Sequence, residues 1–247
     1  MKPIIEVSNV SQRYKGASEN SLNSISFPII KGSKLGIFGP NGAGKTTLIS
    51  IICGILDPTE GSVSYFDNDR NVPLNSMLYK LGYVPQDFSF YAELTPVQNL
   101  KYFGALYSIP KSELNQKIDS LLSILGLTNV ANKKVEEFSG GMKRRVNLAI
   151  GIINDPDILF LDEPTVGVDV QSKNAIISYL EKLNDEGTTI VYTSHHLHEA
   201  QELCDQIILM DQGNLIANDS IESLLDNHKE QNLETLFLRL TGTAYRD

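Results

Sequence analysis

A glycine-rich loop near position 40 restricts the chain to folds that carry such a loop between a strand and a helix. The loop reads Gly39-Pro40-Asn41-Gly42-Ala43-Gly44-Lys45-Thr46. The apolar run Lys34–Phe38 before it predicts a buried strand, and Thr46–Leu56 after it predicts a helix. Glycines let backbone N–H groups wrap an anion, and the helix N-terminus adds partial positive charge. The pattern therefore predicts that Lys45 reaches the β- and γ-phosphates of a nucleotide and that the Thr46 hydroxyl ligates Mg²⁺.

Two carboxylates follow a second buried strand. The apolar run Ile158–Leu161 leads directly into Asp162 and Glu163. Carboxylates at the carboxyl edge of a strand suit a Mg²⁺-nucleotide site. We expect Asp162 to hold Mg²⁺ through water and Glu163 to polarise an attacking water as general base. A strand that meets solvent at two acids is the common alternative, and the phosphate loop upstream favours the functional interpretation.

The rest of the chain alternates between strand and helix patterns. Further strands are predicted at Ile4–Val7, Leu22–Ile30, Gly61–Phe66, Leu81–Val84, Thr188–Thr193 and Gln206–Met210, and further helices at Leu114–Leu125, Met142–Ile153 and Gln171–Asn184. Such alternation predicts an α/β fold with a largely parallel sheet. Helical patterns dominate from about Asp87 to Ile153, which predicts a helical subdomain within the same domain.

Charge and composition exclude several classes of protein. The net charge of −9 disfavours nonspecific binding to nucleic acid or anionic lipid. Two cysteines, Cys53 and Cys204, are too few for a disulfide framework, and Cys53 is expected to be a buried thiol. The longest stretch without a charged residue, Ser120–Asn132, is shorter than the roughly 20 apolar residues of a spanning helix. Because the first residues also lack a signal-peptide pattern, we expect a cytosolic protein.

A third motif resembles the signature of ABC-type ATPases. It reads Phe138-Ser139-Gly140-Gly141-Met142-Lys143-Arg144-Arg145, where the family's usual LSGGQ has Leu and Gln in place of Phe138 and Met142. Ser139 at a helix N-cap, followed by two glycines, presents N–H donors and a hydroxyl to an anion. The three basic residues oppose the helix dipole, which a bound anion would offset. For Arg144 and Arg145, a solvent-exposed basic face is at least as good an interpretation.

The other elements of this family follow in order along nearly the whole chain. Tyr14 stands at the adenine-stacking aromatic, Gln86 at the Q-loop glutamine, Asp169 at the D-loop aspartate and His195 at the switch histidine. The usual D-loop form is SALD, and the corresponding segment here is Val166-Gly167-Val168-Asp169. His195 would contact the γ-phosphate from the end of a strand. His196 and His198 receive no role.

The resemblance implies a fold and a division of the chain. The fold is that of a P-loop NTPase of the RecA-like type, with a mostly parallel sheet, an antiparallel β part and an inserted helical subdomain. Residues 1–247 would form one ATP-binding domain. Its nucleotide-binding core would comprise 1–86 and 156–215, its helical subdomain 87–155 and its C-terminal tail 216–247.

The resemblance also implies ATP and Mg²⁺ as cofactors and assigns roles to residues. The catalytic residues would be Lys45, Gln86, Glu163 and His195, and the Mg²⁺ ligands Thr46, Gln86 and Asp162. Nucleotide binding would involve Tyr14, residues 39–46 and Thr47. Ser139, Gly140, Gly141 and Asp169 would contribute across a dimer, because each signature covers the ATP of a second ATP-binding subunit, the same chain or a close relative.

The work done by hydrolysis would be transport through an integral membrane permease on a separate chain. The protein would then lie on the cytoplasmic face of the membrane, with Phe88–Leu100 near the permease contact. The segments Leu161–Asp169 and Leu236–Asp247 resemble the branch serving drug, polysaccharide and other exporters. No nucleic-acid partner is expected.

Three alternatives fit the sequence less well. A P-loop GTPase needs an NKxD-type guanine reader, and Asn132-Lys133-Lys134-Val135 lacks the aspartate. ABC ATPases that act on nucleic acid or the ribosome carry long coiled coils or tandem domains, and these 247 residues contain neither. A regulatory ATP-dependent dimerisation module would have a decayed site, whereas Lys45, Asp162, Glu163 and His195 are all present.

Overall fold

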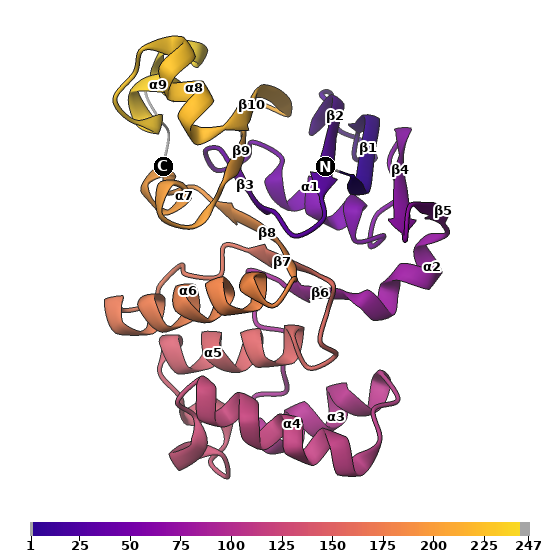
Figure 1. The fold of residues 1–247 in the computed structure, drawn as a ribbon, viewed down its shortest axis with the longest axis vertical. Coiled ribbons are helices and arrows are strands. Elements are labelled where there is room, and N and C mark those ends of the chain that lie inside the picture. Colours follow the sequence, from indigo (N-terminus) through magenta and orange to yellow (C-terminus); the bar gives the residue numbers. More distant parts are fainter. Residues whose placement is uncertain (1, 243–247) are drawn as a thin grey trace. The chain divides into compact units, whose positions relative to one another are not determined.

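The computed structural model describes residues 2–242, which form two compact units. Of these residues, 2–78 and 189–242 belong to unit 1, and Tyr79–Thr188 form unit 2. Figure 1 labels the elements of both units in chain order. The last five residues of the segment Leu236–Asp247 lie outside the described residues.

Unit 1 contains an antiparallel sheet with the order β2-β1-β4-β5. Its strands are β1 (Pro3–Gln12), β2 (Leu22–Ile30), β4 (Glu60–Asp67) and β5 (Arg70–Val72). Alternate residues of β2, including Ile25, Phe27 and Ile29, are buried while their neighbours are more exposed. This period of two is what an antiparallel sheet with one covered face requires.

The second sheet of unit 1 carries the predicted phosphate loop. β3 (Lys34–Phe38) pairs in parallel with both β8 (Thr189–Ser194) and β9 (Gln206–Asp211), and β10 (Asn214–Ser220) runs antiparallel to β9. Phe38 is in register with Ser194. The residues that follow β3 and β8 therefore leave the sheet at the same edge, which is where ligands of parallel α/β sheets bind.

Among residues 2–242, unit 1 also contains five helices. They are α1 (Lys45–Ile52), α2 (Leu74–Met77), α7 (Leu197–Leu203), α8 (Ile221–His228) and α9 (Leu233–Thr241). The predicted tail is thus structured through residue 242. Its apolar residues Leu224, Leu233, Leu236 and Phe237 are buried, and α9 packs against α7 and α8.

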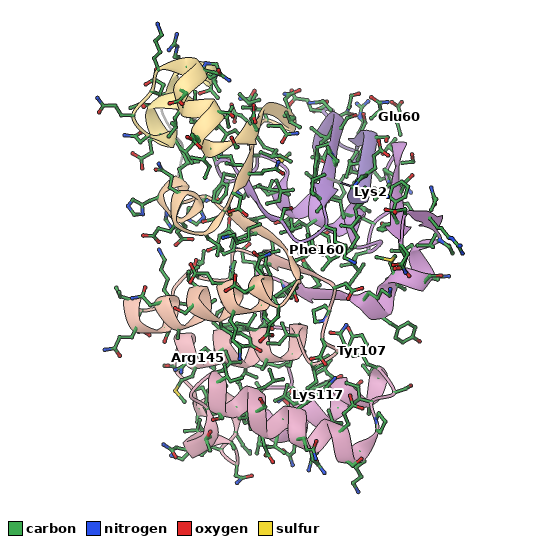
Figure 2. All side chains as sticks on the ribbon, viewed as in Figure 1. Lys2, Glu60, Tyr107, Lys117, Arg145 and Phe160 are labelled. Atoms are coloured by element: carbon green, nitrogen blue, oxygen red, sulfur yellow. The ribbon has the colours of Figure 1, made fainter. Side chains whose placement is uncertain are left out.

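Unit 2 is mostly helical. Its strands β6 (Leu81–Val84) and β7 (Ile158–Asp162) pair in parallel. Its helices are α3 (Pro96–Leu106), α4 (Lys111–Ile124), α5 (Gly140–Gly151) and α6 (Val170–Asp185). Short 3₁₀ turns lie at Leu78–Lys80, which begins in unit 1, and at Thr128–Val130 and Val135–Glu137. α3 packs on α4 and α5, and α5 packs on α6 (Figure 1). Phe160 of β7 is completely buried (Figure 2).

The predicted fold class is confirmed, because the chain has mixed sheets flanked by helices and the predicted strands and helices all form, with ends that differ by a few residues. The boundaries 1–86, 87–155, 156–215 and 216–247 stay a prediction. Cys53 is a buried thiol as expected, and Cys204 is buried too. Within residues 2–242, no helix is both long and apolar enough to cross a membrane.

Candidate nucleotide-binding site

The loop between β3 and α1 owes its shape to its glycines. Gly42 and Gly44 have φ of 80° and 102°, values that favour glycine. A Cβ on Gly39 would collide with the carbonyl oxygen of Met210, and one on Gly44 would lie 2.6 Å from that of Ser21. Gly44 caps α1 without a side chain, and the first turn of α1 contains no acidic residue. The helix N-terminus thus offers its positive end to an anion.

Lys45 crosses this loop. Its Nζ donates hydrogen bonds to the carbonyl oxygens of Gly39 (2.8 Å) and Pro40 (3.3 Å), and the residue is 5% exposed. A buried ammonium needs partners of this kind. The bonds place the positive charge of Lys45 inside the curve of the loop, where the sequence pattern predicts phosphate.

Tyr14 lies beside the start of α1. Its hydroxyl is 3.1 Å from Oγ1 of Thr47, and the residue is 48% exposed. The structure therefore brings Tyr14 and Thr47 together next to the phosphate loop. An exposed aromatic ring there is available for stacking.

His195 follows β8 at the edge where the phosphate loop follows β3. Its ring centroid lies 3.9 Å from that of His196. Ser194, the last residue of β8, donates a 3.1 Å hydrogen bond to the buried carboxylate of Glu199 and accepts one of 2.9 Å from the backbone N–H of His196. These bonds fix the backbone on both sides of His195.

In unit 2, Gln86 and Glu163 meet. Nε2 of Gln86, just after β6, donates a 3.2 Å hydrogen bond to Oε2 of Glu163, just after β7. Glu163 is 5% exposed and has a φ of 49°, which is uncommon for a residue with a side chain. Such backbone conformations are concentrated at functional sites. Asp162, which ends β7, is completely buried.

The signature residues pack against the start of α6. The Ser139 hydroxyl caps α5 by accepting from the N–H of Met142 (3.3 Å), as predicted. Asp169 caps α6 by accepting from the N–H (3.0 Å) and the hydroxyl (2.8 Å) of Ser172, and these bonds lower the pKa of Asp169. A Cβ on Gly141 would lie 2.8 Å from the Ser172 hydroxyl and 2.9 Å from the Asp169 carboxylate. Glycine is required for this approach.

The expectation of a solvent-exposed basic face is wrong for Arg144. The residue is 5% exposed and its Nη1 donates to the carbonyl oxygens of Gln86 (2.8 Å) and Pro85 (3.3 Å). Burial lowers the pKa of Arg144, and the nearby carboxylates of Asp87, Glu163 and Asp162 oppose that shift. Arg145 is half-buried and donates to the Leu125 carbonyl oxygen (2.9 Å).

Sequence interpretation also missed Asn147. This residue is 1% exposed and donates to the Pro85 carbonyl oxygen at 3.0 Å. The available signal was a polar residue on the otherwise apolar face of a predicted helix, since the run Val146–Ile150 is apolar except for Asn147. A polar side chain in such a place is expected to be hydrogen-bonded inside the protein.

The residues present fit both predicted cofactors. For ATP, unit 1 supplies the glycine loop, the helix N-terminus and Lys45. For Mg²⁺, the predicted ligands are the Thr46 hydroxyl, the Gln86 amide and the Asp162 carboxylate, all hard oxygen donors of the kind that Mg²⁺ prefers. Thr46 is exposed at the first turn of α1 and can reach a bound ligand.

Comparison with known proteins identifies the family. A family model described as ABC transporter matches residues 22–166. The chain is 38% identical to the linearmycin resistance ATP-binding protein LnrL of Bacillus subtilis, and the match covers 87% of this chain and 68% of that protein. It is 32% identical to the ABC transporter ATP-binding protein NatA of the same species, and that match covers 95% of this chain and 97% of NatA. It is 34% identical to a Nod factor export ATP-binding protein of Burkholderia lata, with 90% of this chain and 73% of that protein covered.

Solved structures agree. An ATP-binding subunit of an ABC transporter superposes with a TM-score of 0.86 at 25% identity, covering 96% of this chain and 99% of that one. A dimeric ATP-binding cassette in a post-hydrolysis state with ADP and Pi gives 0.79 at 27% identity, covering 87% and 98%. The cbiO1 protein of Clostridium perfringens, part of the cbiONQ transporter complex, gives 0.80 at 25% identity, covering 98% and 97%. The chain therefore belongs to the ABC transporter family, as one of its ATP-binding and ATP-hydrolysing subunits.

Proposed function

We propose that this chain hydrolyses ATP at the phosphate loop to drive export through a membrane permease carried by another polypeptide. The observation that carries the proposal is Lys45, whose buried ammonium lies across a loop shaped by Gly39, Gly42 and Gly44. A β- or γ-phosphate oxygen can replace the carbonyl oxygens as the partner of this ammonium. The exchange would give a charge-assisted bond, which is stronger than a bond to a neutral carbonyl.

Glu163 is the proposed general base. It takes a proton from a water molecule while the water oxygen forms a bond to the γ-phosphorus and the bond from that phosphorus to the β,γ-bridging oxygen breaks, releasing ADP. Gln86 orients Glu163 through its hydrogen bond, and His195 donates to the γ-phosphate. Thr46, Asp162 and Gln86 would hold Mg²⁺, which when bound neutralises charge on the β- and γ-phosphate oxygens.

The active form is proposed to be a dimer. One chain supplies Lys45 and its loop, and the signature residues Ser139, Gly140 and Gly141 of a second ATP-binding subunit cover the same nucleotide. Each chain carries one phosphate loop and one signature, so two chains complete two sites. A similar cassette that holds ADP and Pi is dimeric, which supports the proposal.

The permease is proposed to contact the segment Phe88–Leu100. Phe88 and Tyr91 are 43% and 41% exposed there, and exposed aromatic side chains are typical of protein interfaces. Export is the proposed direction because relatives are named for linearmycin resistance and Nod factor export. A permease partner would place the chain at the cytoplasmic face of a membrane.

Replacing Glu163 by Gln tests the proposal. The Glu163→Gln variant is expected to bind ATP with unchanged affinity, to lose hydrolysis by about a hundredfold or more, and to elute as a dimer in ATP and Mg²⁺ during gel filtration. Glu60→Gln, an exposed change on β4 (Figure 2), is the control. A Glu163→Gln variant with normal turnover would overturn the assignment of the base.

A further inference from the structure

The segment that carries Gln86 is fastened to α5 by two buried side chains. Arg144 donates through Nη1 to the carbonyl oxygens of Pro85 and Gln86, and its guanidinium carbon lies 4.9 Å from the centre of the Phe88 ring. The Arg144 contacts therefore span residues 85 to 88, with Gln86 in the middle. The guanidinium therefore holds the backbone that carries the Gln86 side chain.

Asn147, about one turn further along α5, secures the same segment. Its Nδ2 donates to the Pro85 carbonyl oxygen at 3.0 Å, and its Oδ1 accepts from both the N–H and the hydroxyl of Ser89 at 3.1 Å. Its amide thus bonds to both ends of a five-residue stretch. Arg144 adds contacts to Gln86 and Phe88 between those ends, so side chains of α5 hold segment 85–89 at Pro85, Gln86, Phe88 and Ser89.

Burying the guanidinium of Arg144 costs free energy of folding. Nε of Arg144 is buried and has no hydrogen-bond partner among residues 2–242. Removing a cation from water is expensive unless its donors are satisfied. An apolar side chain of similar length would avoid that cost, so the value of Arg144 lies in what its bonds position.

The positioned group is the side chain of Gln86, which donates to Glu163 at 3.2 Å. A hydrogen bond of this length tolerates little displacement of the backbone that carries the donor. Four residues connect the hydroxyl cap at Ser139 to the guanidinium at Arg144 along α5. The helix that begins at the signature is therefore connected to Glu163 through Arg144 and Gln86.

We propose that Arg144 and Asn147 are positioning residues that hold Gln86 against Glu163, so that α5 transmits the state of the signature to the hydrolytic carboxylate. The inference rests on the roles of Gln86 and Glu163 in the proposed function. Arginine suits this task because a single planar guanidinium donates to two carbonyls and also lies over an aromatic ring. A lysine ammonium at the same place can keep one carbonyl bond but not the stacked plane.

Steady-state kinetics of the full chain test the inference. Arg144→Met is expected to lower kcat for ATP hydrolysis about tenfold, while the dissociation constant for a fluorescent ATP analogue changes less than about twofold. Arg144→Lys is expected to recover part of the loss, and Asn147→Ala to lower kcat about threefold. Loss confined to kcat distinguishes positioning of Glu163 from damage to the phosphate loop.

Two control variants match these changes. Asn154→Ala removes an amide that donates to the carbonyl oxygens of Tyr79 (3.0 Å) and Leu81 (3.1 Å), so it loosens the other end of β6 but not segment 85–89. Lys117→Met removes a cation from α4 (Figure 2). Both are expected to keep kcat within about twofold of the parent. If they slow turnover as much as Arg144→Met and Asn147→Ala do, the inference is wrong.

A double-mutant cycle with Gln86→Ala supplies the decisive measurement. If Arg144 acts through Gln86, then Arg144→Met causes no further loss of kcat in the Gln86→Ala background. If the double variant instead shows the product of the two single-variant losses of kcat, the inference is wrong. The same cycle with Arg144→Lys or Asn147→Ala serves if Arg144→Met lowers the melting temperature.

The failure of the inference and the failure of the proposed function give different results. If Glu163→Gln or Gln86→Ala retains normal kcat, the proposed catalytic roles fail. If both of those variants are slow but Arg144→Met and Asn147→Ala are normal, only the positioning role fails.

Discussion

The side-chain amide of Gln86 donates a 3.2 Å hydrogen bond to the carboxylate of Glu163, joining the ends of the parallel strands β6 and β7. Val84 is in register with Leu161, so each of the two residues lies two positions beyond a paired residue. The parallel pairing therefore brings the two side chains together. The hydrogen bond then fixes the direction in which the carboxylate faces.

Replacing Gln86 by Glu tests the importance of this bond for turnover. Gln86→Glu keeps the size of the side chain but places a second carboxylate beside Glu163. Like charges at this distance disfavour ionisation of both groups, so one carboxyl pKa of the pair rises and the base is partly protonated near neutral pH. We expect kcat to fall about tenfold or more at pH 7 and to recover as the pH rises. The pH dependence of kcat measures this effect.

Gln116→Glu is the control. Gln116 is exposed on α4, so this substitution adds the same negative charge away from Glu163. A Gln86→Glu variant with the parent's pH profile would show that the two side chains do not act together.

The sequence predicted the local parts of the site but not the contacts made by tertiary packing. The phosphate loop, the Ser139 cap and the paired acids follow from residue types close together in the chain. The burial of Arg144 does not, because it depends on segment 85–89, nearly sixty residues earlier, packing on α5. An Arg beside another Arg and a Lys resembles an exposed basic face until that segment is in place.

The missed secondary structure has similar causes. β10 (Asn214–Ser220) is largely polar and pairs with β9 at the end of its sheet. Its residues lack the hydrophobic alternation that predicts strands. The start of α3 did have a local signal. Thr95 and Gln98 form a capping box around Pro96 at the first turn, with both reciprocal bonds present.

A methionine in place of Lys45 is expected to weaken ATP binding. Lys45→Met keeps most of the apolar stem but removes the ammonium that lies across the loop. Hydrogen bonds to charged groups contribute about 1.5–3 kcal/mol, so the ATP dissociation constant is expected to rise about tenfold to a hundredfold. Isothermal titration calorimetry measures the change. Lys31→Met, an exposed substitution just before β3, is the control and is expected to bind ATP as the parent does.

The close approach of Gly141 to α6 predicts different outcomes for two adjacent glycines. Gly141→Ala places a Cβ 2.8 Å from the Ser172 hydroxyl and 2.9 Å from the Asp169 carboxylate, which caps α6 and accepts a hydrogen bond from that hydroxyl. Relieving this clash requires movement of the cap, so we expect a loss of about 1–3 kcal/mol in the free energy of unfolding. A Cβ on Gly140 would lie 3.5 Å from the Gly167 carbonyl oxygen, which is an ordinary contact. Gly140→Ala is therefore expected to leave the stability unchanged or slightly higher.

Urea denaturation of the two alanine variants measures both values. Equal stability of the two variants would mean that α5 and the start of α6 do not pack in solution as described.

Tyr65 links the antiparallel sheet to the helix that begins at the phosphate loop, and it predicts a loss of stability at alkaline pH. Its hydroxyl donates a 2.7 Å hydrogen bond to the carbonyl oxygen of Ile52, the last residue of α1. Burial, with a smaller contribution from Cys53, raises the pKa of Tyr65 to about 12. An unfolded tyrosine has a pKa of about 10, so the fold favours the neutral phenol. Its contribution to stability is complete below about pH 10 and is lost as the pH rises from there towards about 12.

Tyr65→Phe is therefore expected to cost about 1 kcal/mol at pH 8, the contribution of one hydrogen bond, and to lose less stability than the parent between about pH 10 and 12. Urea unfolding at several alkaline pH values measures the slope. Tyr179, whose pKa burial also raises to about 12, is present in both proteins, so the difference between the slopes isolates Tyr65. Parallel slopes would show that Tyr65 ionises as readily in the folded protein as in the unfolded chain.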